Sequence, residues 1–291
     1  MNETEKNQNL LRFATYASVG VATILIIAKL VTYVMTSSVS MLSSLVDSSL
    51  DALASFVNMY AVYVSLMPPD KHHRFGHGKA EPLAGLFQAA FIFGSGIFLL
   101  FESFNRLFTP YTVKNIDMGL YIMGISMALT FALIMFQKYV IKKTSSVAIS
   151  ADMAHYSGDI LMNVGVVLSL IIYKWLDFQY IDSIFSFLVS IYLITTSYKV
   201  TKTSIEYLMD RELPEEIRVD IIKIALEQKE VCGVHDVKTR SSGTHYFIQL
   251  HVELDEKMSL RKAHTIADNI EKEIMKKYTN SEVIVHQDPK E

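Results

Sequence analysis

Six long apolar stretches, separated by short polar segments, make up the first two thirds of the chain. A helix needs about 20 mostly apolar residues to cross a bilayer. Six stretches are long enough, at about 13–35, 39–66, 82–108, 116–138, 147–173 and 182–206. The pattern predicts a polytopic α-helical membrane protein, with a transport-type domain of six transmembrane helices over residues 1–208.

The pattern changes after residue 208 into that of an ordinary charged α+β domain, over residues 209–291. Residues 246–254 alternate apolar and polar side chains, which is typical of a half-buried strand. Helices are predicted near 214–228 and 259–277, with Ser259 as the N-cap of the second. Further strands are predicted near 233–240 and 283–286, with a turn at Ser241–Gly243. The order αββαβ predicts an open-faced, metallochaperone-like sandwich with both helices on one side of a small sheet.

Composition excludes several other classes of protein. The 291 residues are 51% hydrophobic with a formal charge of −3, which argues against nucleic acid as a partner. One cysteine, Cys232, excludes an intramolecular disulfide and a cysteine-based zinc site. The polar N-terminus and the length of the first apolar stretch argue against a cleavable signal peptide.

Basic residues between the apolar stretches predict the orientation in the membrane. The second loop carries Lys71, Arg74 and Lys79, and the fourth carries Lys138, Lys142 and Lys143. The first loop carries none, the third Lys114 and the fifth Lys174. Because basic loops stay on the cytoplasmic side, both termini are expected in the cytoplasm.

Two carboxylates, Asp47 and Asp51, lie in the second apolar stretch. Their spacing of four places them on one helix face, one turn apart. Each ionised carboxylate costs roughly 2.5–3.5 kcal/mol at the centre of a bilayer, so a functional partner is expected.

The fifth apolar stretch supplies a matching pair, His155 and Asp159, again four residues apart. Together with Asp47 and Asp51 they offer three carboxylates and one imidazole, a set that suits a four-coordinate divalent cation such as Zn²⁺. One imidazole favours Zn²⁺, Fe²⁺ or Cd²⁺ over the ions that prefer oxygen alone. Metal and protons compete for such groups, so exchange of metal for protons is the expected mechanism.

Two further segments are rich in possible metal ligands. Residues 70–77 contain Asp70, His72, His73 and His77, a plausible metal site, although a polar loop with turn-forming glycines would show the same pattern.

In the C-terminal domain His251 is expected on the open sheet face. His286 and Asp288 are expected on one face of the last strand, if that strand extends so far. His235 and His264 would join them only if the fold brings them together. Otherwise these histidines are solvated side chains on a polar face.

Three stretches, 75–82, 151–156 and 285–289, resemble the cation diffusion facilitator family, close to its bacterial ferrous-iron/zinc efflux subfamily. The resemblance implies a transport site at Asp47, Asp51, His155 and Asp159. It implies a second site at Asp70, His73 and His77. It also implies a binuclear site formed by His235, His251, His264, His286 and Asp288. Asp288 would bridge two ions and help hold a homodimer, and Lys79 would pair with Asp210. His72 is an extra candidate ligand, and His245 has no implied role.

The function expected is that of a secondary transporter and not of an enzyme. It would export Zn²⁺, with Fe²⁺, Cd²⁺ or Mn²⁺ as possible substrates, across the bacterial cytoplasmic (inner) membrane in exchange for protons. Zn²⁺ would also be bound as a structural ion. One rival, an intramembrane aspartyl protease, needs its two Asp residues on different helices and a Gly-x-Gly-Asp sequence, which is absent. The other rival, a membrane metal sensor, would not need ligands at membrane depth.

Overall fold

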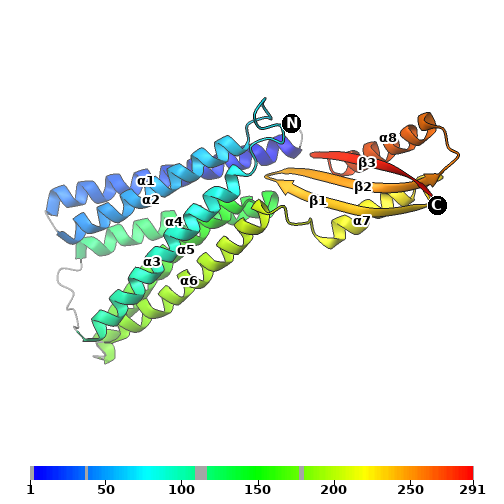
Figure 1. The fold of residues 1–291 in the computed structure, drawn as a ribbon. Helices are drawn as coiled ribbons and strands as arrows, with labels where there is room; N and C mark the ends of the chain where they lie inside the picture. The colour runs from blue at the N-terminus through cyan, green and yellow to red at the C-terminus, as the bar shows by residue number, and fades with distance from the viewer. Residues whose placement is uncertain (1–2, 37–38, 109–116, 177–179, 291) are drawn as a thin grey trace. The chain divides into compact units, whose positions relative to one another are not determined.

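The computed structural model describes residues 3–36, 39–108, 117–176 and 180–290 (Figure 1). The chain divides into two compact units. The helical unit comprises Glu5–Ser65 and Ala80–Ile205, and the sheet unit contains Leu66–Lys79 and Glu206–Glu291. The loop that follows the second helix therefore groups with the C-terminal residues rather than with the helices that flank it in the sequence.

Each of the six apolar stretches forms a helix. The bounds are α1 Glu3–Thr36, α2 Val39–Ser65, α3 Ala80–Phe108, α4 Asp117–Thr144, α5 Val147–Leu176 and α6 Ile181–Leu208. Three predicted boundaries were wrong: α1 begins well before residue 13, α4 continues past residue 138, and α5 continues past residue 173, so that Lys174 lies in the helix instead of in the fifth loop. Lys138, Lys142 and Lys143 therefore lie in α4 instead of in a loop. Lys114, predicted in the third loop, lies outside the described residues.

Four of these helices are long and apolar enough to cross a membrane within the described residues, namely α1, α3, α4 and α6. The remaining two, α2 and α5, carry the ionisable residues Asp47, Asp51, His155 and Asp159. Charged and polar side chains lower the mean hydropathy of a helix. The protein is thus an integral membrane protein with a helical membrane domain, while a count of six spans stays a prediction.

Helix α5 occupies the centre of the helical unit and packs against α2, α3 and α4. Its contact with α6 is close at Gly158, where an added Cβ would clash with Leu193 Cδ2. A larger residue there would require the Leu193 side chain to move, so the glycine permits the close packing of α5 and α6.

The sheet unit has the order predicted from the sequence: α7 Glu215–Leu226, β1 Gly233–Ser242, β2 His245–Asp255, α8 Leu260–Lys277 and β3 Ser281–Lys290. Strand β2 lies in the middle, antiparallel to β1 and parallel to β3. Strand β1 includes Ser241 and Ser242, predicted as a turn, and the chain reverses at Gly243, whose φ of 60° suits glycine. Ser259 does precede α8, but its side chain makes no capping hydrogen bond.

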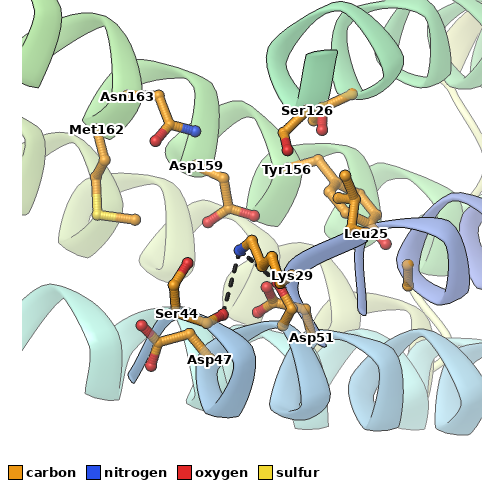
Figure 2. A pocket seen from close by; sticks show the side chains of 13 residues that line it. Leu25, Lys29, Ser44, Asp47, Asp51, Ser126, Tyr156, Asp159, Met162 and Asn163 are labelled. Carbon is orange, nitrogen blue, oxygen red and sulfur yellow. Dashed lines mark hydrogen bonds between the residues drawn. The ribbon is translucent and has the colours of Figure 1, made fainter. Parts of the chain in front are cut away.

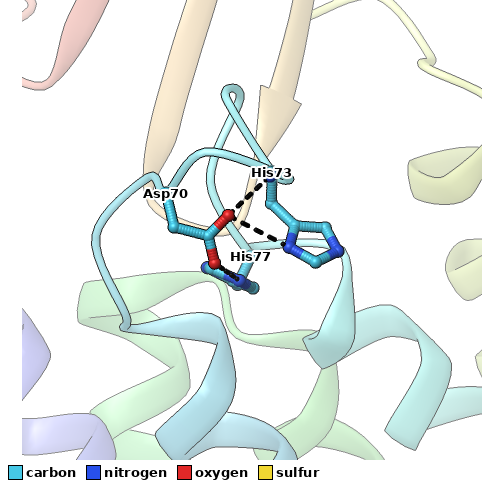
Figure 3. Close-up of side chains that lie close together, drawn as sticks. All are labelled: Asp70, His73 and His77. Atoms are coloured by element: carbon cyan, nitrogen blue, oxygen red, sulfur yellow. Dashed lines mark hydrogen bonds and ion pairs between the residues drawn. The ribbon is translucent and has the colours of Figure 1, made fainter.

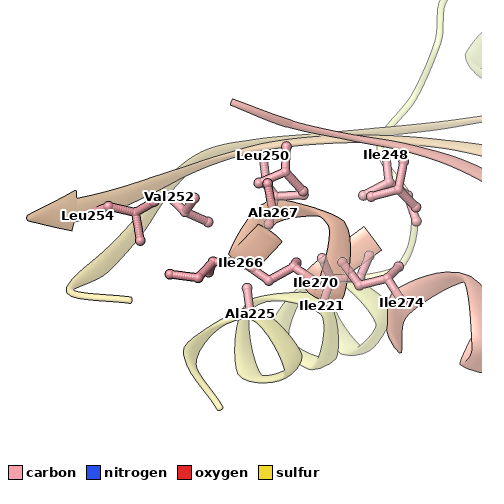
Figure 4. Close-up of a cluster of buried hydrophobic side chains, with 12 residues drawn as sticks. Ile221, Ala225, Ile248, Leu250, Val252, Leu254, Ile266, Ala267, Ile270 and Ile274 are labelled. Carbon is pink, nitrogen blue, oxygen red and sulfur yellow. The ribbon is translucent and has the colours of Figure 1, made fainter. Parts of the chain in front are cut away.

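Both helices of the sheet unit cover one face of the sheet (Figure 4). The core between them is formed by alternate residues of β2 and by apolar residues of α7, α8 and β3: Ile248, Leu250, Val252, Leu254, Ile221, Ala225, Ile266, Ala267, Ile270, Ile274, Val283 and Val285. Burial of each large side chain is worth about 1.5–3 kcal/mol. This core fixes which face of the sheet is left for polar residues.

The loop Leu66–Lys79 is anchored within the sheet unit. A Cβ on Gly78 would clash with the backbone carbonyl of Ser242, so only glycine permits this approach. The Arg240 guanidinium lies 4.9 Å from the Phe75 ring centroid and 4.5 Å from that of Phe247. Cation–π contacts of this kind hold a loop against a strand.

An ion-pair chain continues this anchoring. Asp210 Oδ1 lies 3.0 Å from Lys79 Nζ and 3.2 Å from Arg240 Nη1. Burial alone would raise the pKa of Asp210, but hydrogen bonds from Lys79 and Arg240 outweigh it and hold that pKa below its usual value. The pair of Lys79 and Asp210 implied by the family resemblance is therefore present.

Candidate metal centres

Asp51, His155 and Asp159 form a compact cluster in the helical unit. One ligand atom from each lies within 4.8 Å of the others. His155 Nε2 is 3.0 Å from Asp51 Oδ1 and 3.8 Å from Asp159 Oδ2. His155 is buried, with the Phe91 ring edge-on at 6.0 Å. Burial and the Phe91 contact restrict the rotamers of His155, so that its ring nitrogen faces the two carboxylates.

A pocket of about 160 Å³ adjoins this cluster (Figure 2). Its lining includes Asp47, Asp51 and Asp159. Helix α1 adds one charged residue to the lining, Lys29. Asp47 contributes to the pocket but lies outside the compact group of three ligands. The pocket has room for several water molecules, so a partly hydrated ion fits in it.

The pocket lies nearer to one end of α2 than to the other. Ser44 and Asp47 precede Asp51 in α2, while Met162 and Asn163 follow Asp159 in α5. The α2 residues lie in the first half of that helix, Val39–Ser65, whereas the α5 residues lie near the middle of Val147–Leu176. The basic residues of the loop Leu66–Lys79 follow the other end of α2.

A buried polar network joins four helices beside the cluster. Asp152, fully buried in α5, accepts hydrogen bonds from Ser18 Oγ of α1 at 2.6 Å and Gln137 Nε2 of α4 at 2.7 Å. Ser55 Oγ of α2 is 3.5 Å from the same carboxyl group and 2.9 Å from the Tyr156 hydroxyl. Because Asp152 lies one turn before His155, this network fixes the orientation of the helix that carries the ligand.

The loop of the sheet unit brings Asp70, His73 and His77 together (Figure 3). Asp70 Oδ1 lies 3.4 Å from His73 Nδ1, and Asp70 Oδ2 lies 3.3 Å from His77 Nε2. The backbone N–H groups of His73 and His72 donate to Asp70 and lower its pKa below the usual value. An ionised carboxylate between two imidazoles suits a divalent cation.

The open face of the sheet carries a third group. His251 is paired in register with His235 on β1 and with His286 on β3, so the three rings lie side by side across the sheet. Asp288 Oδ2 is 2.8 Å from His251 Nδ1 and 3.2 Å from His235 Nε2, and its Oδ1 is 3.2 Å from His286 Nε2. The His251 hydrogen bond is the main reason why the pKa of Asp288 lies below its usual value.

Among the described residues of one chain, three other histidines contribute no ring nitrogen to these groups. His264 is on α8, exposed, with Nε2 3.7 Å from Asp268. His245 Nδ1 donates to Asn280 Oδ1 at 3.2 Å. His72 contributes its backbone N–H to Asp70. A role for His264 as a metal ligand stays a prediction.

Asp152 and Lys29 were not predicted as parts of a site. Asp152 belongs to the same motif as His155, but spacing says nothing of its partners on other helices. Lys29 lies within the first apolar stretch, and no part in a site was predicted for it. A single charge in an apolar stretch was the signal that pointed to it.

Six long helices, carboxylate–imidazole clusters and a small α+β unit define a helical membrane protein with the donor sets of divalent-metal sites. Residues 15–209 match the model of the cation efflux transmembrane domain, and residues 213–290 match that of the cation efflux protein cytoplasmic domain. The chain belongs to the cation efflux family, also called the cation diffusion facilitators.

Relatives along nearly the whole chain agree with this assignment. A cation-efflux pump FieF of Shewanella oneidensis is 40% identical over 99% of this chain and 97% of its own length. FieF of Serratia proteamaculans is 38% identical over 96% and 93%, and protein p34 of Rickettsia prowazekii is 42% identical over 97% and 94%. A solved structure of CzrB is 25% identical and covers 27% of this chain and 99% of its own, with a TM-score of 0.26.

Proposed function

We propose that the protein exports divalent transition-metal cations from the cytoplasm in exchange for protons. The observation that carries this proposal is the cluster of Asp51, His155 and Asp159 between α2 and α5, beside a pocket that also includes Asp47. Such a donor set at the depth of apolar helices is costly unless it binds a cation. We assign Zn²⁺ as the principal substrate, because one imidazole among carboxylates favours it over Mg²⁺ or Ca²⁺.

Proton exchange follows from the chemistry of the ligands. Carboxylates and an imidazole bind metal only when deprotonated, so protons and metal compete for the same atoms. A site open to the outside would release metal as it takes up protons. The same site, open to the cytoplasm, would lose the protons and load metal again.

The proposed orientation places both termini in the cytoplasm, in the inner membrane of a bacterium. All six helices α1–α6 would cross the bilayer. The basic residues of the loop Leu66–Lys79 and of the end of α4 support this orientation. The pocket beside the cluster would then face outward, since its α2 residues lie in the half of α2 that is farther from the loop Leu66–Lys79.

The sheet unit would bind resident Zn²⁺ and hold a homodimer together. The face that carries His235, His251, His286 and Asp288 offers three imidazoles and a carboxylate, a donor set that zinc prefers. Asp288 uses both of its oxygens toward neighbouring histidines, so it could bridge two ions. His264, which lies elsewhere in one chain, would join the site through the arrangement of the dimer. Asp70, His73 and His77 would bind a further ion in the loop.

Proteoliposomes under an imposed pH gradient test the proposed function. The wild-type protein is expected to move Zn²⁺ only when protons move the other way, with Fe²⁺, Cd²⁺ and Mn²⁺ as competitors. Asp51→Ala is expected to abolish transport, whereas Lys142→Met, an exposed change in α4, retains it. Metal movement that ignores the pH gradient would refute the exchange mechanism.

The same assay separates the two rival functions. A membrane metal sensor would bind metal without moving it, and Asp51→Ala would not change efflux in cells. An intramembrane protease would need two catalytic carboxylates on different helices that face each other. Asp51 on α2 and Asp159 on α5 meet that geometric requirement, but His155 Nε2 contacts both carboxylates and the chain has no Gly-x-Gly-Asp sequence.

A further inference from the structure

Lys29 places a fixed positive charge beside the transport cluster. It extends from α1, and Nζ donates to Ser48 Oγ at 2.6 Å and to the Ser44 carbonyl oxygen at 3.2 Å, both on α2. In Figure 2 the ammonium nitrogen lies between the side chains of Asp159 and Asp51. The two hydrogen bonds hold the ammonium group in the pocket and keep it from extending toward the end of α1.

The summed formal charge of the ionised pocket side chains is opposite and equal to that of one divalent cation. Asp47, Asp51 and Asp159 carry −3 when all three are ionised, and the Lys29 ammonium brings the set to −2. One divalent cation therefore leaves the loaded pocket neutral. Without Lys29, the empty pocket would carry −3, which is more unfavourable among apolar helices than −2, so metal binding would neutralise a less stable site.

We propose that the Lys29 ammonium is a built-in counter-cation of the transport site, which stabilises the empty site and sets its affinity for divalent cations. In the empty site the ammonium group partly neutralises the carboxylates. When a metal ion binds, the two cations repel each other, so the affinity stays low enough for release. The inference rests on the proposed transport function and adds a residue to the site that no carboxylate or histidine motif includes.

A binding experiment on the full-length protein in detergent tests this role. The loop and sheet-face sites are first removed by His73→Ala, His77→Ala and Asp288→Ala, so that calorimetry reports the transport site. The dissociation constant for Zn²⁺ and for Cd²⁺ is then compared at one pH. The variants are Lys29→Met, Lys29→Arg and the control Lys142→Met, an exposed lysine of α4.

Loss of the positive charge is expected to tighten binding by about tenfold or more, because like charges at this range repel strongly in a medium of low dielectric constant. Lys29→Arg keeps the charge and is expected to stay within about threefold of the parent protein. In proteoliposomes, Lys29→Met is expected to lower both KM and kcat, because a tightly held ion leaves slowly. A purely structural lysine would lower kcat without tightening binding.

Unchanged or weaker binding in a folded Lys29→Met variant would overturn the proposal. If that variant does not fold, Lys29→Gln removes the charge but can still donate to Ser44 and Ser48, and the same criterion applies to it. A parent protein that binds no metal after removal of the other two sites would instead refute the proposed transport function. The two failures are therefore distinguishable.

Discussion

Asp51 and His155 are 104 residues apart in the chain, yet His155 Nε2 lies 3.0 Å from Asp51 Oδ1. This hydrogen bond joins α2 to α5 and brings Asp51 into the cluster with His155 and Asp159. The His155 imidazole is the one nitrogen ligand of this cluster, so the choice of metal is expected to depend on His155.

His155→Asp is expected to shift the preference of the transport site from Zn²⁺ toward Mn²⁺. An all-oxygen set favours harder ions, and the ratio of the Zn²⁺ and Mn²⁺ affinities should fall by about tenfold or more. Competition uptake in proteoliposomes measures the ratio. His251→Asp, which changes the sheet face, is the matched control and should leave the transported metal unchanged. An unaltered ratio in His155→Asp would show that this ring does not bind the cargo.

Asp152→Ala is expected to destabilise the helical unit by about 1–3 kcal/mol, because Ser18 and Gln137 lose a buried acceptor. Asp152→Asn should cost less, since its amide oxygen can accept both bonds. Thermal stability in detergent, followed by size-exclusion chromatography, ranks the variants. Ser49→Ala is the control, because the exposed Ser49 hydroxyl donates to Leu45 O in its own helix. Equal stability of Asp152→Ala and wild type would contradict the role of this network.

Asp288→Ala is expected to weaken Zn²⁺-dependent dimerisation by about tenfold or more, since one carboxylate contacts three histidines. Removal of metal by a chelator should lower the dimer fraction of the wild-type protein in the same way. Light scattering in detergent reports both effects. Glu282→Ala, an exposed change on the same strand, should have no effect. A dimer that is insensitive to both chelator and Asp288→Ala would rule out metal-linked dimerisation.

A second carboxylate of the sheet unit predicts a pH dependence that does not involve metal. Asp220 on α7 accepts hydrogen bonds from Lys277 Nζ at 2.6 Å and Tyr278 OH at 2.7 Å, which lower its pKa. Its stabilising effect is therefore present above the unfolded pKa of about 3.9 and is lost as the pH falls through the lowered value.

Asp220→Asn should cost about 0.5–1 kcal/mol at pH 7, a modest amount because the pair is partly solvated. The difference from wild type should disappear as the pH falls below the lowered pKa of Asp220. Burial, and then Asp220, raises the pKa of Tyr278 to about 12, so this part of the effect is lost only as the pH rises from 10 toward 12. Hydrogen exchange of the α7 and α8 amides at matched pH measures the change. Asp268→Asn, on the exposed side of α8, is the control.

Periodic patterns predicted most of the fold. The six helices, the αββαβ order and the buried side of β2 follow from repeats that any local window reveals. Spacing also placed His155 and Asp159 on one helix face. Contacts between distant segments could not be predicted in this way. No local pattern indicates that Asp152 meets Ser18, or that the loop Leu66–Lys79 packs on the residues of the sheet.

The ends of elements were the other difficulty. Helix α4 continues through its lysines because Lys is a good helix former, and the charges that predicted a loop do not end a helix. Strand β1 continues through Ser241 and Ser242 because Gly243 supplies the reversal. Such ends depend on tertiary contacts and on backbone conformation more than on hydrophobicity.

The bonds from Lys29 to Ser44 and Ser48 also have a consequence for biosynthesis. Helices α1 and α2 leave the ribosome long before α5, so in the proposed six-span arrangement Asp47 and Asp51 enter the bilayer while their partner His155 does not yet exist. Lys29 precedes them in the chain and binds the same face of α2. The first hairpin of the nascent protein thus carries its own compensating charge into the membrane, ahead of any metal.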